Sequence, residues 1–195
     1  MTSHDSTTSC VVVAIATVSY DVLADLPARD RERMPMHANG QEWLVSWHSP
    51  DDEPGGTPHG AAGVCVGPED ELVLVSTDGR RWKLPAGRPE GDETLEETLR
   101  RELREEACVE VVRARLLGYT RGKCVQGHEQ GLVLVRSVWR ADVRILAWEP
   151  EHEIEHRLVV PAGLARRYLR FPDEGATRIH VRALVEAGFG EPRTG

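Results

Sequence analysis

The sequence predicts an α/β fold, an α/β/α sandwich around a mixed β-sheet. Short apolar or alternating runs of strand length recur from Gly60 onward, a charged helix with a leucine stripe interrupts them, and two helical segments follow them. Strands interspersed with helices that must each bury one face imply helices on both faces of a sheet. A chain of 195 residues is long enough to form one such domain with a sizeable core.

The first 58 residues are expected to form an N-terminal extension that packs on the core, with the main domain spanning residues 59–195. Within it, Cys10–Val18 is apolar but too short to span a bilayer, and no basic segment precedes it, so a strand is predicted. Trp43–Trp47 predicts another strand, and Ser49–Pro58 a loop rich in Pro, Gly and Asp. The extension could cover a sheet edge, shape a substrate pocket or form a dimer contact, and the sequence leaves these roles open.

The main domain is predicted to contain strands on both sides of one long helix. Apolar or alternating runs predict strands before the helix at Ala61–Val66, Leu72–Ser76 and, briefly, Trp82–Leu84, and after it at Val109–Tyr119, Gly131–Trp139 and Asp142–Leu146. Two more helices are predicted at Ala162–Leu169 and Thr177–Ala187, the second ending at Gly188.

The long helix is expected to begin near Thr94. A Thr with Glu97 three residues later forms a capping box, in which each side chain bonds the other residue's backbone N–H. Leucines then recur every fourth residue, at Leu95, Leu99 and Leu103, which gives the helix one apolar stripe to bury.

Three glutamates of this helix are expected to form one carboxylate cluster. At roughly 100° per residue, Glu102, Glu105 and Glu106 fall within a sector of about 100° that borders the leucine stripe. Carboxylates that close repel one another strongly beside a buried face, so the cluster needs a cation. Hard oxygen ligands suit Mg²⁺ or Mn²⁺, and Gly87 and Gly91 lie just before the helix, where a backbone carbonyl could join them.

The segment from Gly87 to Val109 resembles the Nudix box, the signature of the Nudix hydrolases. The match comprises Gly87, five residues, Glu93, seven residues, Arg101-Glu102-Leu103, one residue, Glu105-Glu106, one residue, and Cys108-Val109. Cys108 stands where the box usually has glycine, and Ala86 where a second glycine often precedes Gly87. Since Cys108 lacks the tolerance of glycine for positive φ, we expect the helix end to be built differently here.

The resemblance implies a Nudix-type sandwich and metal-dependent hydrolysis of a nucleoside diphosphate linked to another moiety. By motif position it implies that Glu105 and Glu106 are the principal metal ligands, that Glu102 is a further ligand or the base, and that the Gly87 carbonyl completes the site. Arg101 is then placed to orient a glutamate, and Glu93 to tether the loop before the helix. The substrate remains open among nucleoside triphosphates, nucleotide sugars and similar organic pyrophosphates. A Nudix-fold ligand-sensing module without catalysis is the alternative, although such a module is expected to lose some of these carboxylates.

A second segment, His152 to Pro161, supports two interpretations. It resembles the Nudix segment in which Glu-Ile leads into Val-Pro, which implies that Glu153 approaches the metals as a ligand or general base; a solvated loop glutamate is the alternative. The same stretch contains His-Glu-x-x-His, the zinc metallopeptidase motif, with His152 and His156 as the two histidines. That site requires a helix, whereas Leu158–Pro161 is predicted to be extended.

Composition limits the partners. The net charge of −8 argues against stable complexes with nucleic acid or anionic membranes and favours a small nucleotide-type substrate that approaches with metal. Four cysteines, Cys10, Cys65, Cys108 and Cys124, lack metal-binding spacing, so reduced thiols and a cytoplasmic location are expected. A homodimer remains open.

Overall fold

A computed structural model of the protein describes residues 33–150 and 153–189. The predicted strand Cys10–Val18 lies outside these residues, as does His152. None of the helices in the described ranges is long and apolar enough to cross a membrane.

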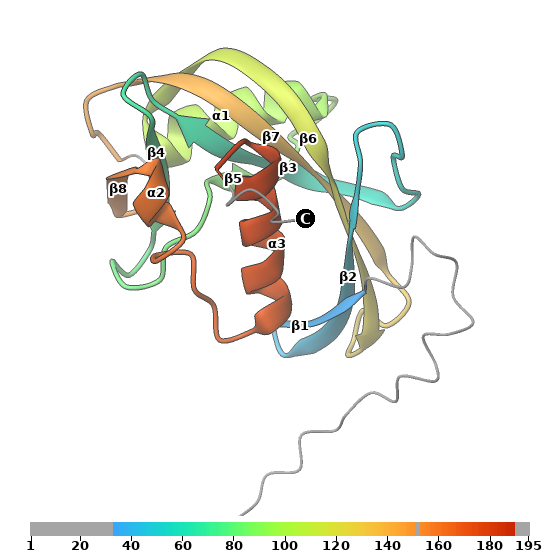
Figure 1. Ribbon diagram of the computed structural model, residues 1–195. Coiled ribbons are helices and arrows are strands. Elements are labelled where there is room, and N and C mark those ends of the chain that lie inside the picture. Colours follow the sequence, from blue (N-terminus) through green and yellow to red (C-terminus); the bar gives the residue numbers. More distant parts are fainter. Residues whose placement is uncertain (1–32, 151–152, 190–195) are drawn as a thin grey trace, which may run out of the picture. The chain divides into compact units, whose positions relative to one another are not determined.

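The described residues form a mixed β-sheet, as predicted (Figure 1). Its strands lie in the order β1-β2-β6-β7-β3-β4-β8, and a short strand, β5, pairs with β3. The β3–β7 pair is parallel and the others are antiparallel. The bounds are β1 Met34–Ala38, β2 Gln41–His48, β3 Thr57–Val66, β4 Glu71–Ser76, β5 Ala86–Gly87, β6 Val109–Gln126, β7 Val133–Ile145 and β8 His156–Pro161.

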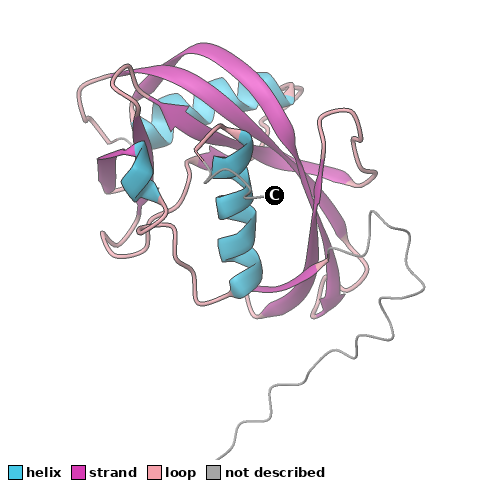
Figure 2. Ribbon diagram, in the orientation of Figure 1, coloured by secondary structure: helices cyan, strands magenta, loops and turns pink. Residues whose placement is uncertain are grey.

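Helices cover both faces of this sheet, which confirms the predicted sandwich (Figure 2). Alternate residues of the central strands point to opposite faces, so one strand serves two cores. Cys65 of β3 and Val73 of β4 pack under α1 (Leu95–Ala107) with Leu99 and Leu103. Their neighbours Val64, Leu72 and Leu74 join the opposite core, with Ala183 and Leu184 of α3 (Glu174–Glu186). In Figure 1 α3 lies in front of the sheet and α1 behind it.

Two strands from the expected N-terminal extension belong to the same sheet. β1 and β2 form a hairpin whose turn uses Asn39 and Gly40 at positive φ, and β2 pairs along β6. Trp43 and Val45 of β2 are buried in a small cluster with Ile179 of α3. The hairpin therefore lengthens the sheet beneath α3.

Several boundaries differ from the prediction. Gly131–Trp139 and Asp142–Leu146 were predicted as separate strands but belong to the single strand β7, because Arg140 continues the pairing and donates to the carbonyl of Ala187 at 2.7 Å. The short run at Trp82–Leu84 forms only an isolated bridge, between Lys83 and Val75.

The C-terminal helices also differ in length. The predicted helix Ala162–Leu169 is reduced to α2, Ala162–Ala165. α3 begins before the predicted Thr177, because the carboxylate of Asp173 caps it by accepting the Ala176 N–H at 3.0 Å.

Candidate active site on helix α1

Helix α1 is fixed at its start and along one side. The Glu97 N–H donates to Thr94 Oγ1 at 3.2 Å and the Thr94 N–H donates to Glu97 Oε2 at 2.8 Å, which confirms the predicted capping box. Leu99 and Leu103 are fully buried against the sheet. Burial of two leucines contributes several kcal/mol and sets the rotation of the helix, so Glu102, Glu105 and Glu106 lie along its edge.

The three glutamates differ in exposure and in partners. Glu106 is buried; its Oε2 accepts the Ala86 N–H at 2.8 Å, and its Oε1 lies 3.4 Å from Lys83 Nζ. Arg101 Nη1 donates to Glu102 at 3.1 Å and to Glu105 at 3.0 Å. The carboxylates are thus held by one arginine, one lysine and one backbone amide.

Arg101 connects this cluster to the loop before the helix. Its Nε and Nη2 donate to the two oxygens of Glu93 at 2.8 and 3.0 Å, and Nη2 also donates to the Arg88 carbonyl at 2.7 Å. Arg101 and the N–H of Glu90 lower the pKa of Glu93 to about 2. Glu93 and Arg101 therefore tie the Gly87 loop to α1, an arrangement that orients the neighbouring carboxylates.

The environment of Glu102 disfavours its negative charge. Burial raises the pKa of Glu102, and repulsion from Glu106 and Glu105 raises it further, while Arg101 opposes the shift. A cation bound beside these three groups would relieve both effects.

Gly87 is required by close packing against Glu102. A Cβ built on Gly87 would lie 1.8 Å from Glu102 Cδ. Gly60 of β3 allows a second close approach, because its Cβ would lie 2.1 Å from the Gly87 carbonyl oxygen. Two glycines thus let β3, the segment at Gly87 and helix α1 meet within van der Waals contact.

The oxygen atoms of these carboxylates are suitable ligands for a hard divalent ion, but in the structure the carboxylates contact Arg101 and Lys83. Among residues 33–150 and 153–189, no three His, Cys, Asp or Glu side chains already surround one metal position. The reason is visible in the contacts: Arg101 bridges Glu102 and Glu105, while Glu106 is turned to Ala86 and Lys83. Residues able to hold a metal are the carboxylates of Glu102, Glu105 and Glu106 and the carbonyl of Gly87.

Cys108 ends the helix in the left-handed conformation, with φ 47° and ψ 56°. The expectation of a differently built helix end is therefore wrong, because the cysteine adopts the conformation that glycine would take. Its N–H donates to the Arg104 carbonyl at 3.1 Å, and its Sγ lies 3.5 Å from the Glu149 carbonyl oxygen. These bonds and burial of the side chain hold the residue against its backbone strain.

Glu153 lies apart from these contacts. It is exposed beside Ile154, which is buried in the core under α1, and it forms no hydrogen bond or ion pair with another described residue. Residues 153–155 are not helical, and His156 begins β8 opposite Ser76. The helix that a His-Glu-x-x-His zinc site needs is absent from this described segment, so the metallopeptidase interpretation lacks its scaffold.

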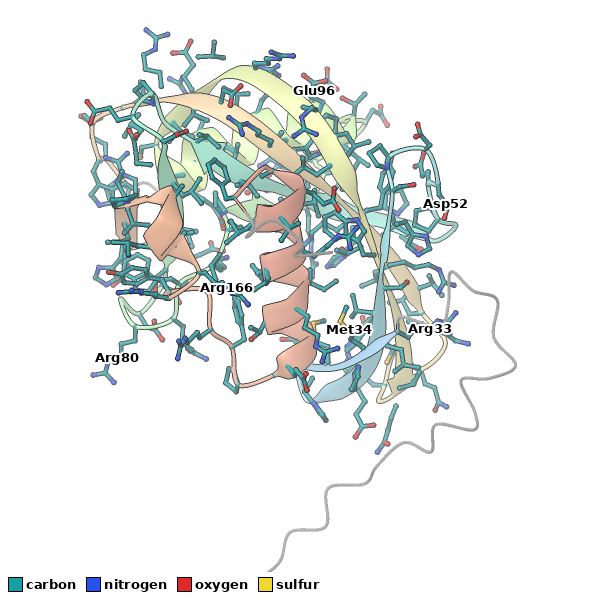
Figure 3. The ribbon with its side chains drawn as sticks, in the orientation of Figure 1. Arg33, Met34, Asp52, Arg80, Glu96 and Arg166 are labelled. Carbon is teal, nitrogen blue, oxygen red and sulfur yellow. The ribbon has the colours of Figure 1, made fainter. Side chains whose placement is uncertain are left out.

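A Ser-His-Asp arrangement that the sequence did not predict is also present, but its serine is not accessible to a substrate. Ser46 Oγ lies 3.0 Å from His48 Nε2, and His48 Nδ1 lies 3.2 Å from Oδ2 of Asp52, which is labelled in Figure 3. The Ser46 side chain is buried, with only 1% of its surface exposed. A nucleophile must reach its substrate, so this chain is a buried polar network and not a hydrolytic triad.

Lys83 is a site residue that sequence reasoning missed. It lies in the stretch predicted as a short strand, and nothing in its local pattern indicates a contact with Glu106, far along the chain. The isolated bridge to Val75 creates that contact.

The sequence matches the NUDIX domain model over residues 57–177, more than half of the chain. The chain belongs to the Nudix family. Among solved structures it is similar to a mutant of the Bacillus subtilis pyrophosphohydrolase BsRppH, with a TM-score of 0.59, 21% identity, and coverage of 80% of this chain and 99% of that one. It is also similar to a NUDIX hydrolase from Nitrosomonas europaea, with a TM-score of 0.52, 19% identity, and coverage of 71% and 94%. At these identities the structures support the Nudix fold. No curated protein matches the sequence.

Proposed function

We propose that this Nudix protein is a Mg²⁺- or Mn²⁺-dependent pyrophosphohydrolase, which hydrolyses a nucleoside diphosphate linked to another moiety. The observation that supports it best is the group of three carboxylates on one edge of α1, bordered by a glycine whose missing side chain admits Glu102. A divalent ion bound there would neutralise the diphosphate and lower the pKa of an attacking water.

The residues of the chain then have distinct tasks. Glu105 and Glu106 are the principal ligands, with the Gly87 carbonyl beside them. Glu102 is a further ligand or accepts the proton of the attacking water. Arg101 positions Glu102 and Glu105 through its hydrogen bonds, and Glu93 fixes Arg101.

The base has a second candidate in Glu153. Its exposed carboxylate has no partner among the described residues, so it is free to take a proton if the segment before β8 reaches the substrate. Among the described residues no hydrogen bond or ion pair joins Glu153 to α1, whereas Glu102 is already within the cluster.

The test is a screen of nucleoside triphosphates, nucleotide sugars and dinucleotides with Mg²⁺ or Mn²⁺, reading released phosphate and pyrophosphate. Glu105→Gln should lower kcat on the best substrate by about 10²-fold or more, because a ligand charge is lost in the transition state. Glu96→Gln is the matched control: Glu96 lies on the same helix, exposed at the surface and bonded to Arg100 (Figure 3).

Two results would count against the proposal. Near wild-type rates for Glu105→Gln and Glu106→Gln, together with hydrolysis that survives chelation by EDTA, would show that the site assignment is wrong. Tight calorimetric binding of one compound with no turnover of any would favour the ligand-sensing alternative.

A further inference from the structure

Arg136 of β7 is a partly buried cation with no part in the roles assigned above. Its Nε is enclosed and has no hydrogen-bond partner among the described residues, and its guanidinium forms no ion pair with a described carboxylate. Leaving an enclosed charged donor without a hydrogen-bond acceptor destabilises the protein unless a ligand supplies the acceptor.

The sheet places this guanidinium beside the candidate active site. Gly60 of β3 is the register partner of Arg136, next to a bulge between Pro58 and Gly60. The Cβ position of Gly60 lies 2.1 Å from the Gly87 carbonyl oxygen and 3.4 Å from Arg136 Nε. The Gly87 carbonyl oxygen, a proposed metal ligand, and Arg136 Nε are therefore separated by only a few ångström.

A second arginine accompanies it. Arg88 follows Gly87 directly, and its guanidinium is also unpaired within the described ranges. The two guanidiniums repel each other, since Arg88 lowers the pKa of Arg136 after the larger effect of burial. Glu106 and Glu102, the carboxylates that act on Arg136 in the opposite sense, belong to the metal cluster.

His59 lies near Arg136 and Arg88, and its side chain is uncharged near neutral pH. Burial, Arg136 and Arg88 lower the pKa of His59 to about 4, against a weaker opposing effect of Glu129, which is bonded to Gln41. His59 and Arg88 line a cavity of about 510 Å³ that also touches Pro58 and Pro89. The cavity is large enough for a nucleoside-sized group.

We propose that Arg136, with Arg88, binds a phosphate group of the substrate beside the carboxylates of α1, while the remaining moiety occupies the cavity lined by His59. Two unpaired guanidiniums match a phosphate in charge and in hydrogen-bonding geometry. A metal ion on Glu102 and Glu106 would remove the counter-charge that Arg136 now faces, so the phosphate would supply the missing anion. This inference rests on the proposed function only in naming that anion as part of a substrate.

The test measures binding rather than turnover. Methylenediphosphonate, a non-hydrolysable diphosphate, is titrated calorimetrically with Mg²⁺ into the wild-type protein and into Arg136→Met. We expect binding to the variant to be at least about tenfold weaker, as expected for loss of a charge-assisted bidentate contact.

Arg140→Met is the matched control. Arg140 lies on the same strand, but its guanidinium already donates to Asp142 and to the Ala187 carbonyl. We expect this control to bind the probe within about twofold of wild type and to melt at a lower temperature, because it loses both bonds. Arg136→Met should melt no lower than wild type, since it removes an unpaired cation, and this separates a ligand-binding role from a structural one.

Affinity for the probe unchanged in folded Arg136→Met, or no binding by wild type at millimolar probe, would overturn the inference. If the methionine variant does not fold, Arg136→Lys provides the same test, because lysine keeps the positive charge but cannot form the bidentate hydrogen bonds of a guanidinium. Affinity for the probe equal to that of wild type would overturn the inference, and binding at least fivefold weaker would support it. Hydrolysis with no effect of Arg136 would refute this inference alone. Binding that depends on Arg136 without any hydrolysis would refute the proposed function alone.

Discussion

Gly87→Ala changes the position of one carboxylate without changing any charge. The new Cβ would lie 1.8 Å from Glu102 Cδ and 1.9 and 2.1 Å from its two oxygens. To reach ordinary van der Waals separation, the carboxylate must retreat by roughly 2 Å. The φ of Gly87 lies outside the left-handed region, so the backbone itself tolerates alanine.

The displacement sets the expected loss of activity. A misplacement of about 1 Å at a catalytic group costs about 10²-fold in rate, so kcat on the best substrate of the screen should fall by at least about 10²-fold. Because the displaced group is the flexible end of a side chain, the melting temperature should change by no more than about 3 °C.

The measurement compares kcat with Mg²⁺ and thermal unfolding by circular dichroism for Gly87→Ala, Gly55→Ala and wild type. Gly55 is the control because its Cβ would meet nothing within 4 Å and its φ is also outside the left-handed region. If folded Gly87→Ala keeps kcat within threefold of wild type, the position of Glu102 is not important for the reaction and the assignment of its role is wrong.

The remaining predictions concern three other positions. Carboxyl NMR should show Glu93 titrating with a pKa of about 2, and Arg101→Met should return that pKa toward the ordinary 4.5. Because the pKa of Glu93 is lower in the folded state than in the unfolded state, the stabilisation by the Glu93–Arg101 pair is present above about pH 4.5 and is lost as the pH falls toward 2. An unshifted pKa of Glu93 would contradict the geometry. In urea unfolding, Cys108→Gly should be more stable than Cys108→Ala by about 1 kcal/mol, because both lack Sγ but only alanine keeps a Cβ in the left-handed conformation; equal stabilities would show that this conformation carries no strain. Glu153→Gln should lower kcat by about 10²-fold if Glu153 is the base. Glu155→Gln is its control, because Glu155 is also exposed and follows the buried Ile154; small and equal effects of the two variants would leave the base on α1.

Local sequence was sufficient to predict helix α1. The capping box and the leucine stripe are both local patterns: the box forms as predicted, and Leu99 and Leu103 are buried, whereas Leu95 is only partly buried. The end of the helix was predicted less well. Whether a cysteine takes the left-handed conformation depends on partners such as the Glu149 carbonyl, which local sequence does not specify.

The strand errors have the same origin. Arg140 interrupts an apolar pattern, so the sequence predicts two strands where β7 is continuous. In the structure Arg140 faces the C-terminal end of α3 and is satisfied by the Ala187 carbonyl. A polar residue in a strand can be recognised as part of it only when the distant group that satisfies it is known.

The acidic and the basic residues of the candidate site therefore differ in how far local sequence predicts their positions. The carboxylates occupy fixed positions on one helix, so their spacing in the sequence is their spacing in space. Arg136 and Lys83 reach the site only through the β3–β7 register and the bridge to Val75, both of which depend on tertiary structure. If Arg136 binds the substrate phosphate as proposed, substitutions at this position of β7 would alter which anion is bound, while the carboxylates keep their spacing along α1. For this reason the sequence predicts the proposed chemistry but leaves the substrate open.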